Sequence, residues 1–109
     1  MKEIKAIIRP ARLTKVRDAF RKLEGFPGMT ISKVQGCSEH EGEESHLDIR
    51  DELTDFSGKV RIEMLVHDDL MEKVVDIIHQ HAYTGQKGDG ILWVSEVVEF
   101  RRLCKREAG

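Results

Sequence analysis

The strongest constraint in this sequence of 109 residues is an order of predicted elements that occurs twice: strand, helix, strand. Alternating apolar and polar side chains indicate strands, and apolar side chains three and four residues apart indicate one face of a helix. The predicted strands are residues 2–8, 29–36, 59–67 and 91–100, and the predicted helices follow the N-caps Thr14 and Asp68. Two βαβ halves of similar length favour an α+β, ferredoxin-like split βαβ domain with four antiparallel strands and both helices on one face.

The second face of such a sheet has no helix to cover it. Ile7, Ile31 and Leu65 are the apolar side chains that we expect to lie on that face. The alternative is a monomer whose sheet is half solvated, but burying these side chains needs a partner. The pattern therefore favours an oligomer.

Length and apolar content limit the class of protein. A chain of this length forms one domain with one core. No run approaches the roughly 18 apolar residues of a membrane span, and residues 1–3 do not begin a signal peptide. We therefore expect a cytoplasmic protein that does not insert into a membrane.

The charge is distributed unevenly along the chain. Residues 38–58 carry eight acidic side chains and one basic side chain, Arg50, so the net charge of this segment is −7, whereas that of the whole chain is −2. The remainder, with 17 basic and 12 acidic side chains, holds +5. A basic body suits an anionic small molecule, and the absence of a compact Lys/Arg stripe with interleaved aromatic residues argues against nucleic acid as a partner.

Residues 84–90, TGQKGDG, admit two interpretations on their own. Gly85 just beyond a helix is a common left-handed stop, and the following residues suit a turn. Three glycines also suit a main-chain cradle for phosphates. A resemblance to the PII nitrogen-regulatory signal transducers favours the cradle. The first strand and helix of that family resemble MKEIKAIIRPARLTKVRDAF, its second strand resembles GMTISKVQG, and its third strand resembles KVRIEMLV. Its phosphate-binding B-loop and fourth strand resemble TGQKGDGILWVSEV.

The resemblance implies one PII-like domain over residues 1–109, with a T-loop at about 37–58, a B-loop at 84–90 and a C-terminal segment at 100–109. It implies a homotrimer that binds ATP, ADP or AMP in clefts between subunits. It further implies that the T-loop controls a protein target in nitrogen metabolism, which could be a membrane transporter, an enzyme or a regulator. The nucleotide-binding residues that it implies are Thr30, Gly36, Cys37, Ser38, Lys59, Glu63, Leu65, Gly85, Lys87, Gly88, Asp89, Gly90 and Arg102.

Two basic side chains of the family pattern are replaced in this chain. The lysine that usually follows GDG is Ile91, and the second C-terminal arginine is Cys104. Lys87, Lys105 and Arg106 are the side chains that could substitute for them. We expect a preference for ADP or AMP over ATP.

The T-loop also departs from the family pattern. His40 replaces a glutamine that in typical members touches magnesium and 2-oxoglutarate, and Glu39 replaces an arginine. The only tyrosine, Tyr83, lies beside the B-loop, so uridylylation of the T-loop is not expected.

Cys37, His40 and His46 among carboxylates form a ligand set that suits zinc or another transition metal. The alternative function is therefore a PII-like trimer that responds to or buffers a transition metal or another inorganic ion and serves an ion transporter. Loops of this composition are more often simply solvated. An enzyme is not expected, because no nucleophile with a positioned base and no paired catalytic carboxylates stand at a suitable spacing.

Overall fold

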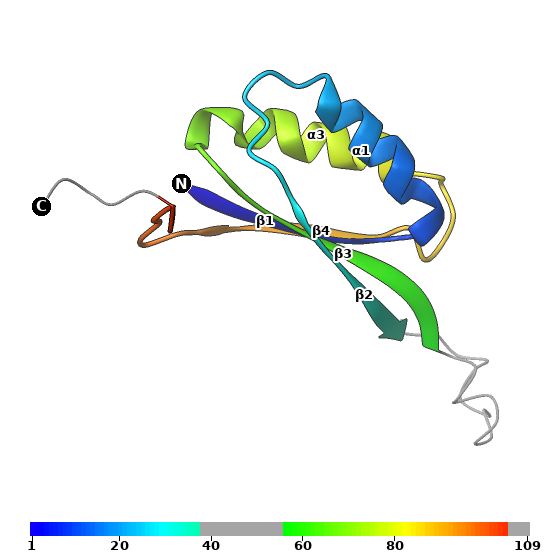
Figure 1. Cartoon of the computed structure of the whole chain (residues 1–109). Coiled ribbons are helices and arrows are strands. Elements are labelled where there is room, and N and C mark those ends of the chain that lie inside the picture. Colours follow the sequence, from blue (N-terminus) through cyan, green and yellow to red (C-terminus); the bar gives the residue numbers. More distant parts are fainter. Residues whose placement is uncertain (38–55, 105–109) are drawn as a thin grey trace, which may run out of the picture.

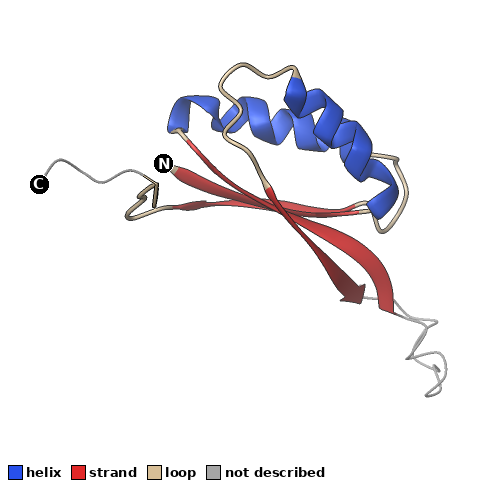
Figure 2. Ribbon diagram, in the orientation of Figure 1, coloured by secondary structure: helices blue, strands red, loops and turns tan. Residues whose placement is uncertain are grey.

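The computed structural model describes residues 1–37 and 56–104. A four-stranded antiparallel sheet in the order β2-β3-β1-β4 carries both helices on one face (Figures 1 and 2). The strands are β1 (Lys2–Ile8), β2 (Thr30–Cys37), β3 (Phe56–Val66) and β4 (Gly90–Glu96), and the helices are α1 (Leu13–Arg21) and α3 (Met71–Ala82). The predicted α+β, split βαβ fold is confirmed.

The central strand β1 sets the position of the other elements. It pairs with β3 on one side and with β4 on the other, so that Ile8 lies opposite both Val60 and Gly90. At the other end of β1, Glu3 lies opposite Leu65 and Ser95. Strands β2 and β4 form the two edges of the sheet.

The core lies between the sheet and the two helices. The alternating apolar side chains of β3, Val60, Ile62, Met64 and Val66, are all buried, and Ile62 is fully inaccessible to solvent. Phe20 of α1 is also fully buried and stacks on Phe26, with 5.0 Å between the ring centroids. The buried residues are Ile4, Ala6, Ile8, Val16, Phe20, Val60, Ile62, Met64, Val66, Val74, Ile78 and Ala82.

Both predicted helix N-caps are wrong. A 3-10 turn at Pro10–Arg12 leads directly into α1, because proline already has the backbone angle that suits a first helical position, and Thr14 lies inside the helix. Asp68 opens a second 3-10 turn, and its carboxylate accepts a hydrogen bond from the amino group of Met1 at 2.8 Å instead of capping α3. Neither helix, within the described ranges, is long and apolar enough to cross a membrane.

The last strand is shorter than predicted. β4 ends at Glu96, and Val97 makes one further hydrogen bond, from its N–H to the carbonyl of Met1 at 3.2 Å. Beyond this contact, residues 97–104 form no further strand.

The face of the sheet opposite the helices is called the open face below, and it is partly apolar. Ile7 and Leu65 lie on it as predicted, but Ile31 lies opposite Ile62 on the helix side. Pairing with β1 adds Ile91 and Trp93 to the open face. The side chain of Trp93 remains 40% exposed. This face is therefore the apolar surface that an oligomer would bury.

Candidate functional site

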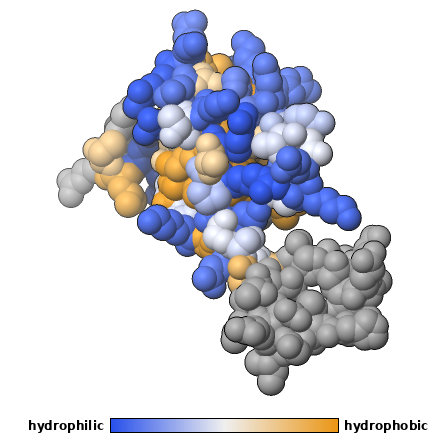
Figure 3. Space-filling model, turned by 90° about the vertical axis from the view of Figure 1, so that its right-hand side faces the viewer, coloured by the Kyte–Doolittle hydropathy of each residue, from blue (hydrophilic) through white to orange (hydrophobic). Residues whose placement is uncertain are grey.

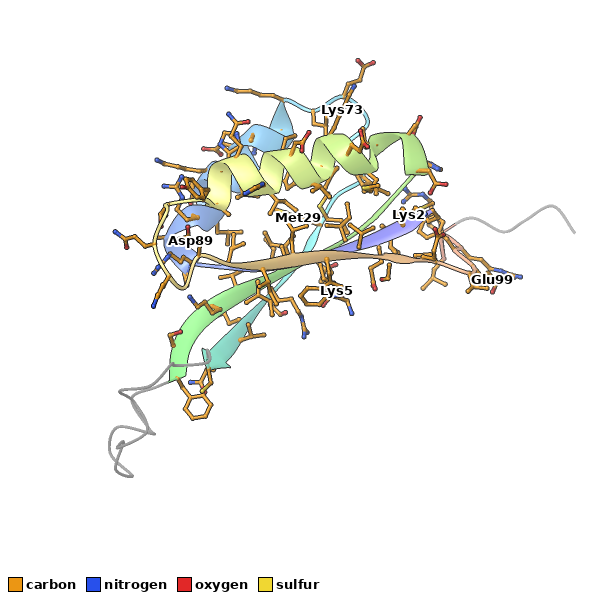
Figure 4. The ribbon with its side chains drawn as sticks, turned by 180° about the vertical axis from the view of Figure 1, so that it is seen from behind. Lys2, Lys5, Met29, Lys73, Asp89 and Glu99 are labelled. Atoms are coloured by element: carbon orange, nitrogen blue, oxygen red, sulfur yellow. The ribbon has the colours of Figure 1, made fainter. Side chains whose placement is uncertain are left out.

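Asp89 holds the loop of residues 84–90 in one conformation. Its carboxylate accepts four hydrogen bonds, from the N–H and hydroxyl of Thr84, the N–H of Gly85 and Nε of Arg9. The amide bonds from Thr84 and Gly85 measure 2.7 and 2.9 Å, and the bond from Arg9 measures 3.0 Å. Donation by Thr84 is the main reason that the pKa of Asp89 lies well below its ordinary value, with Arg9 and Gly85 adding to it. Asp89, labelled in Figure 4, thus organises the loop from within.

Two glycines of this loop meet a steric demand. A Cβ on Gly90 would lie 1.7 Å from the carbonyl oxygen of Ile7, so only glycine allows β4 to begin against β1 at this point. Gly88 has a φ of 90°, and a Cβ there would lie 3.2 Å from the guanidinium of Arg9. Gly85 is not the helix stop that one interpretation assigned to it, because α3 already ends at Ala82 with an extended Tyr83.

Two basic side chains hold carbonyl groups in the main chain of the loop. Arg9 Nη2 donates to the carbonyl of Lys87 at 2.5 Å, and Lys59 Nζ donates to the carbonyl of Gly88 at 2.5 Å. In a trans peptide the N–H of the next residue points away from the carbonyl. Because Arg9 holds the carbonyl of Lys87, the N–H of Gly88 points away from Arg9. Within the described residues, no protein acceptor bonds the N–H of Lys87 or Gly88. Adjacent N–H groups without a protein acceptor, beside a lysine, suit an anion.

Gly36 and Lys59 connect this loop to strands β2 and β3. A Cβ on Gly36 would lie 3.2 Å from Cγ of Lys59, so the missing side chain leaves room for the lysine to reach Gly88. We call Gly36, Lys59 and residues 84–90 the loop cluster. It unites seven of the predicted nucleotide-binding residues: Gly36, Lys59, Gly85, Lys87, Gly88, Asp89 and Gly90.

A second group of predicted residues lies elsewhere. Thr30, Glu63, Leu65 and Arg102 line a hollow of about 310 Å³, which we call the strand groove. Thr30 and Glu63 are opposite each other on β2 and β3, and Glu63 forms an ion pair with Arg61 at 2.9 Å. The guanidinium of Arg102 lies 5.6 Å from the ring centre of Phe100, which also lines the groove.

The loop cluster and the strand groove lie near opposite ends of β1. Ile8 pairs with Gly90 at the first, and Glu3 pairs with Leu65 at the second. The five steps along β1 from Glu3 to Ile8 span about 17 Å at the usual rise of a strand. The two groups therefore do not form one site within a single chain.

The loop also borders a larger hollow of about 660 Å³ on the helix side of the sheet, lined in part by Val75, Ile78 and Tyr83. Figure 3, which views the end of the molecule where the loop lies, shows hydrophobic surface exposed between hydrophilic side chains. The sequence pattern predicted neither this hollow nor a role for Arg9. The sequence signal for Arg9 was its place directly after a predicted strand, which did not indicate its partner Asp89.

Several predicted residues fall at the edge of the described chain or beyond it. Cys37 is the last residue of β2, lies opposite Phe56 and is exposed. Strand β3 begins within the predicted T-loop, since residues 56–58 belong to it. Ser38, Glu39, His40, His46, Lys105 and Arg106 lie outside the described residues. In the described part of the chain, no three His, Cys, Asp or Glu side chains gather as metal ligands, and the metal site stays a prediction.

Comparison with known proteins gives similarity over nearly the whole chain. The family model described as Nitrogen regulatory protein P-II matches residues 1–107. Nitrogen regulatory protein P-II of Bradyrhizobium diazoefficiens is 36% identical over 109 residues, which cover 100% of this chain and 96% of that protein. Nitrogen regulatory protein P-II 1 of Escherichia coli K12 is 38% identical over 103 residues, which cover 94% and 91% respectively.

Proposed function

Since the chain belongs to the Nitrogen regulatory protein P-II family, we propose that it binds an adenine nucleotide between two subunits and thereby controls a protein target. Membership makes it a signal transduction protein of nitrogen regulation, in a family of regulatory proteins rather than enzymes. The observation that carries the proposal is the division of the predicted site into a loop cluster and a strand groove that one chain keeps apart.

The loop cluster suits the phosphate end of a nucleotide. The N–H groups of Lys87 and Gly88 have no acceptor among the described residues, and the ammonium of Lys59 lies at the carbonyl of Gly88. Main-chain N–H groups and one or two lysines are the usual partners of a phosphate in a glycine-rich loop. The hydrogen bonds to Asp89 keep the loop in place before a ligand arrives, which lowers the entropic cost of binding.

The strand groove suits the base of the nucleotide. Leu65 and the ring of Phe100 supply apolar contacts for a heterocycle, and the guanidinium of Arg102 adds a positive charge to the lining of the groove. Glu63 is an acceptor for an exocyclic amino group such as that of adenine, and the hydroxyl of Thr30 can donate or accept beside it.

A second copy of the chain brings the two halves together. The loop cluster of one subunit then faces the strand groove of its neighbour, and the nucleotide lies between them. The apolar open face, with Ile7, Leu65 and Trp93, gives the subunits a surface to bury, and trimers are the norm in this family. We therefore propose a homotrimer with the nucleotide in each cleft.

The ligand is connected to the proposed T-loop at about 37–58 through the ends of β2 and β3. Lys59 contacts Gly88 and lies three residues from Phe56, which is opposite Cys37 where the loop begins. A change at Lys59 is thus passed to the base of the T-loop along a strand ladder. We propose that the nucleotide alters the fit of the T-loop to a transporter, an enzyme or a regulator.

Complementation between two defective chains tests the proposed cleft. Gly88→Val disables the loop cluster, because valine disfavours a φ of 90° and its Cβ would press on Arg9. Arg102→Ala disables the strand groove. Each variant alone should bind no nucleotide in titration calorimetry, whereas a refolded mixture should regain binding in about a quarter of the clefts, those that combine one intact loop cluster with one intact groove.

Matched variants control for general damage. Gly25→Val places the same side chain at a φ of 83° on a residue that lines neither half, and Arg101→Ala removes a neighbouring arginine that pairs with Glu99. Both should bind nucleotide as the parent chain does. A mixture of Gly88→Val and Arg102→Ala that binds no nucleotide, although it is folded and oligomeric, would contradict a site shared between subunits.

A further inference from the structure

Ile91 is an apolar side chain at the border of a surface built for an anion. It directly follows Gly90, is 65% exposed, and lies opposite Ile7 on the open face. Lys59 belongs to the same face of the sheet, since it alternates with Val60, whose side chain points into the core. Beyond the lysine, the open face continues with Ile7 and Ile91, and with Arg61, which lies opposite Ile7 and whose charge is paired with Glu63 at 2.9 Å.

The loop cluster has few positive charges left for a ligand. Arg9 and Asp89 neutralise each other at 3.0 Å, and the guanidinium of Arg9 also serves the carbonyl of Lys87. Among the described residues of the cluster, Lys59 and Lys87 are the cations that pair with no carboxylate. In the proposed cleft, the neighbouring subunit adds Arg102 as a third.

This balance decides between nucleotides. A monophosphate carries up to about two negative charges, and each further phosphate in a chain adds about one more. Three cations match a mono- or diphosphate. A triphosphate leaves at least one charge to be desolvated against Ile7 and Ile91, which is unfavourable for an unpaired charge.

We propose that this chain binds nucleoside mono- and diphosphates at least as tightly as triphosphates, and that Ile91 determines this preference. The inference rests on the proposed nucleotide site and specifies its ligand. An exposed position on an edge strand accepts a longer polar side chain without disturbing the core. Ile91→Lys is therefore a direct test.

The experiment is titration calorimetry of the parent chain and of Ile91→Lys with AMP, ADP and ATP, each with and without magnesium. Val98→Lys is the matched control, because its side chain is fully exposed and lines neither the loop cluster nor the strand groove. The parent chain should bind ATP no more tightly than AMP or ADP. Ile91→Lys should shift the affinity ratio toward ATP by about tenfold, the usual effect of one charge-assisted contact, while Val98→Lys leaves the ratio unchanged.

The outcomes separate this inference from the proposed function. Binding of all three nucleotides with ATP more than tenfold tighter in the parent chain would overturn the inference and leave the nucleotide site intact. An equal shift in Ile91→Lys and Val98→Lys would overturn the role of Ile91. No binding of any nucleotide would overturn the proposed function, and the inference with it. The parent ratio decides the ligand preference even if Ile91→Lys fails to fold.

Discussion

Arg9 and Asp89 are separated by 80 residues in the sequence, and Nε of Arg9 donates a hydrogen bond to Oδ1 of Asp89 at 3.0 Å. The same guanidinium holds the carbonyl of Lys87 at 2.5 Å. Arg9 directly follows β1, so the end of the central strand anchors the loop cluster from outside. The loop is thus preorganised by the fold.

Arg9→Gln should weaken nucleotide binding without unfolding the protein. The shorter, neutral side chain loses both contacts, and the ligand must then order a looser loop. We expect about a tenfold loss of affinity in titration calorimetry, corresponding to one charge-assisted hydrogen bond. Arg17→Gln is the control, because this exposed arginine of α1 pairs with Asp18 and contacts no part of the loop. Equal affinities in the two variants would show that the anchor is irrelevant to binding.

Asp89 should make stability depend on pH in the acid range. Its pKa is lowered in the folded chain from an ordinary value of 3.8, mainly by donation from Thr84, so the folded state binds the proton less readily than the unfolded state does. The stabilisation is complete above about pH 4 and is lost progressively as the pH falls below that value.

Comparison with Asp89→Asn measures this effect. In urea unfolding at fixed protein concentration, the parent chain should be more stable than the variant at pH 7 and at pH 5, by the same margin. At pH 3 and below the margin should narrow. A margin that stays constant down to pH 2 would mean that the carboxylate gains nothing from its four donors in the folded state.

Gly90→Ala should be strongly destabilising, whereas Gly58→Ala should be nearly neutral. A Cβ at residue 90 would lie 1.7 Å from the carbonyl oxygen of Ile7, which forces β4 away from β1. At Gly58 no atom lies within 4 Å of the same Cβ. Urea unfolding should show a loss of at least about 2 kcal/mol for the first variant and less than about 0.5 kcal/mol for the second. Similar losses would contradict the close approach of the two strands.

The strand pattern and the resemblance predicted different parts of this structure. Period-two alternation identified the buried face of β3, because the direction of each side chain follows from its parity along the strand. Ile31 was placed on the wrong face because the alternation of β2 is weak. Its true face follows from its pairing with Ile62, which the sequence of β2 alone does not give.

Contacts between distant residues were beyond local patterns. The N-cap predictions failed because Pro10 starts its helix earlier and because Asp68 bonds the amino group of Met1 at the far end of the sequence. Arg9 was missed for the same reason, since nothing local indicates a partner 80 residues away. The family motif indicated which residues gather at the loop. That Gly88 and Thr30 lie apart in the folded chain became known only from the pairing of the strands.

The open face supplies a test of the assembly on which the shared cleft depends. Trp93→Glu should dissociate the homotrimer, because Trp93 lies on this face beside Lys5 and a new carboxylate would be buried without sufficient pairing when subunits meet. Leu103→Glu is the control, with a fully exposed side chain outside the sheet. Light scattering should give a trimer mass for the parent chain and for Leu103→Glu, and a lower mass for Trp93→Glu.

Nucleotide titration of the same samples links assembly to binding. Trp93 lines neither the loop cluster nor the strand groove of its own chain, so its substitution removes no contact to the ligand that the two halves provide. If the cleft needs two subunits, affinity should fall with the trimer mass and recover at protein concentrations that restore the trimer. A folded, monomeric Trp93→Glu variant that binds nucleotide with the parent affinity would place the whole site within one chain. The separation of the two halves along β1, about 17 Å for five strand steps, argues against that outcome.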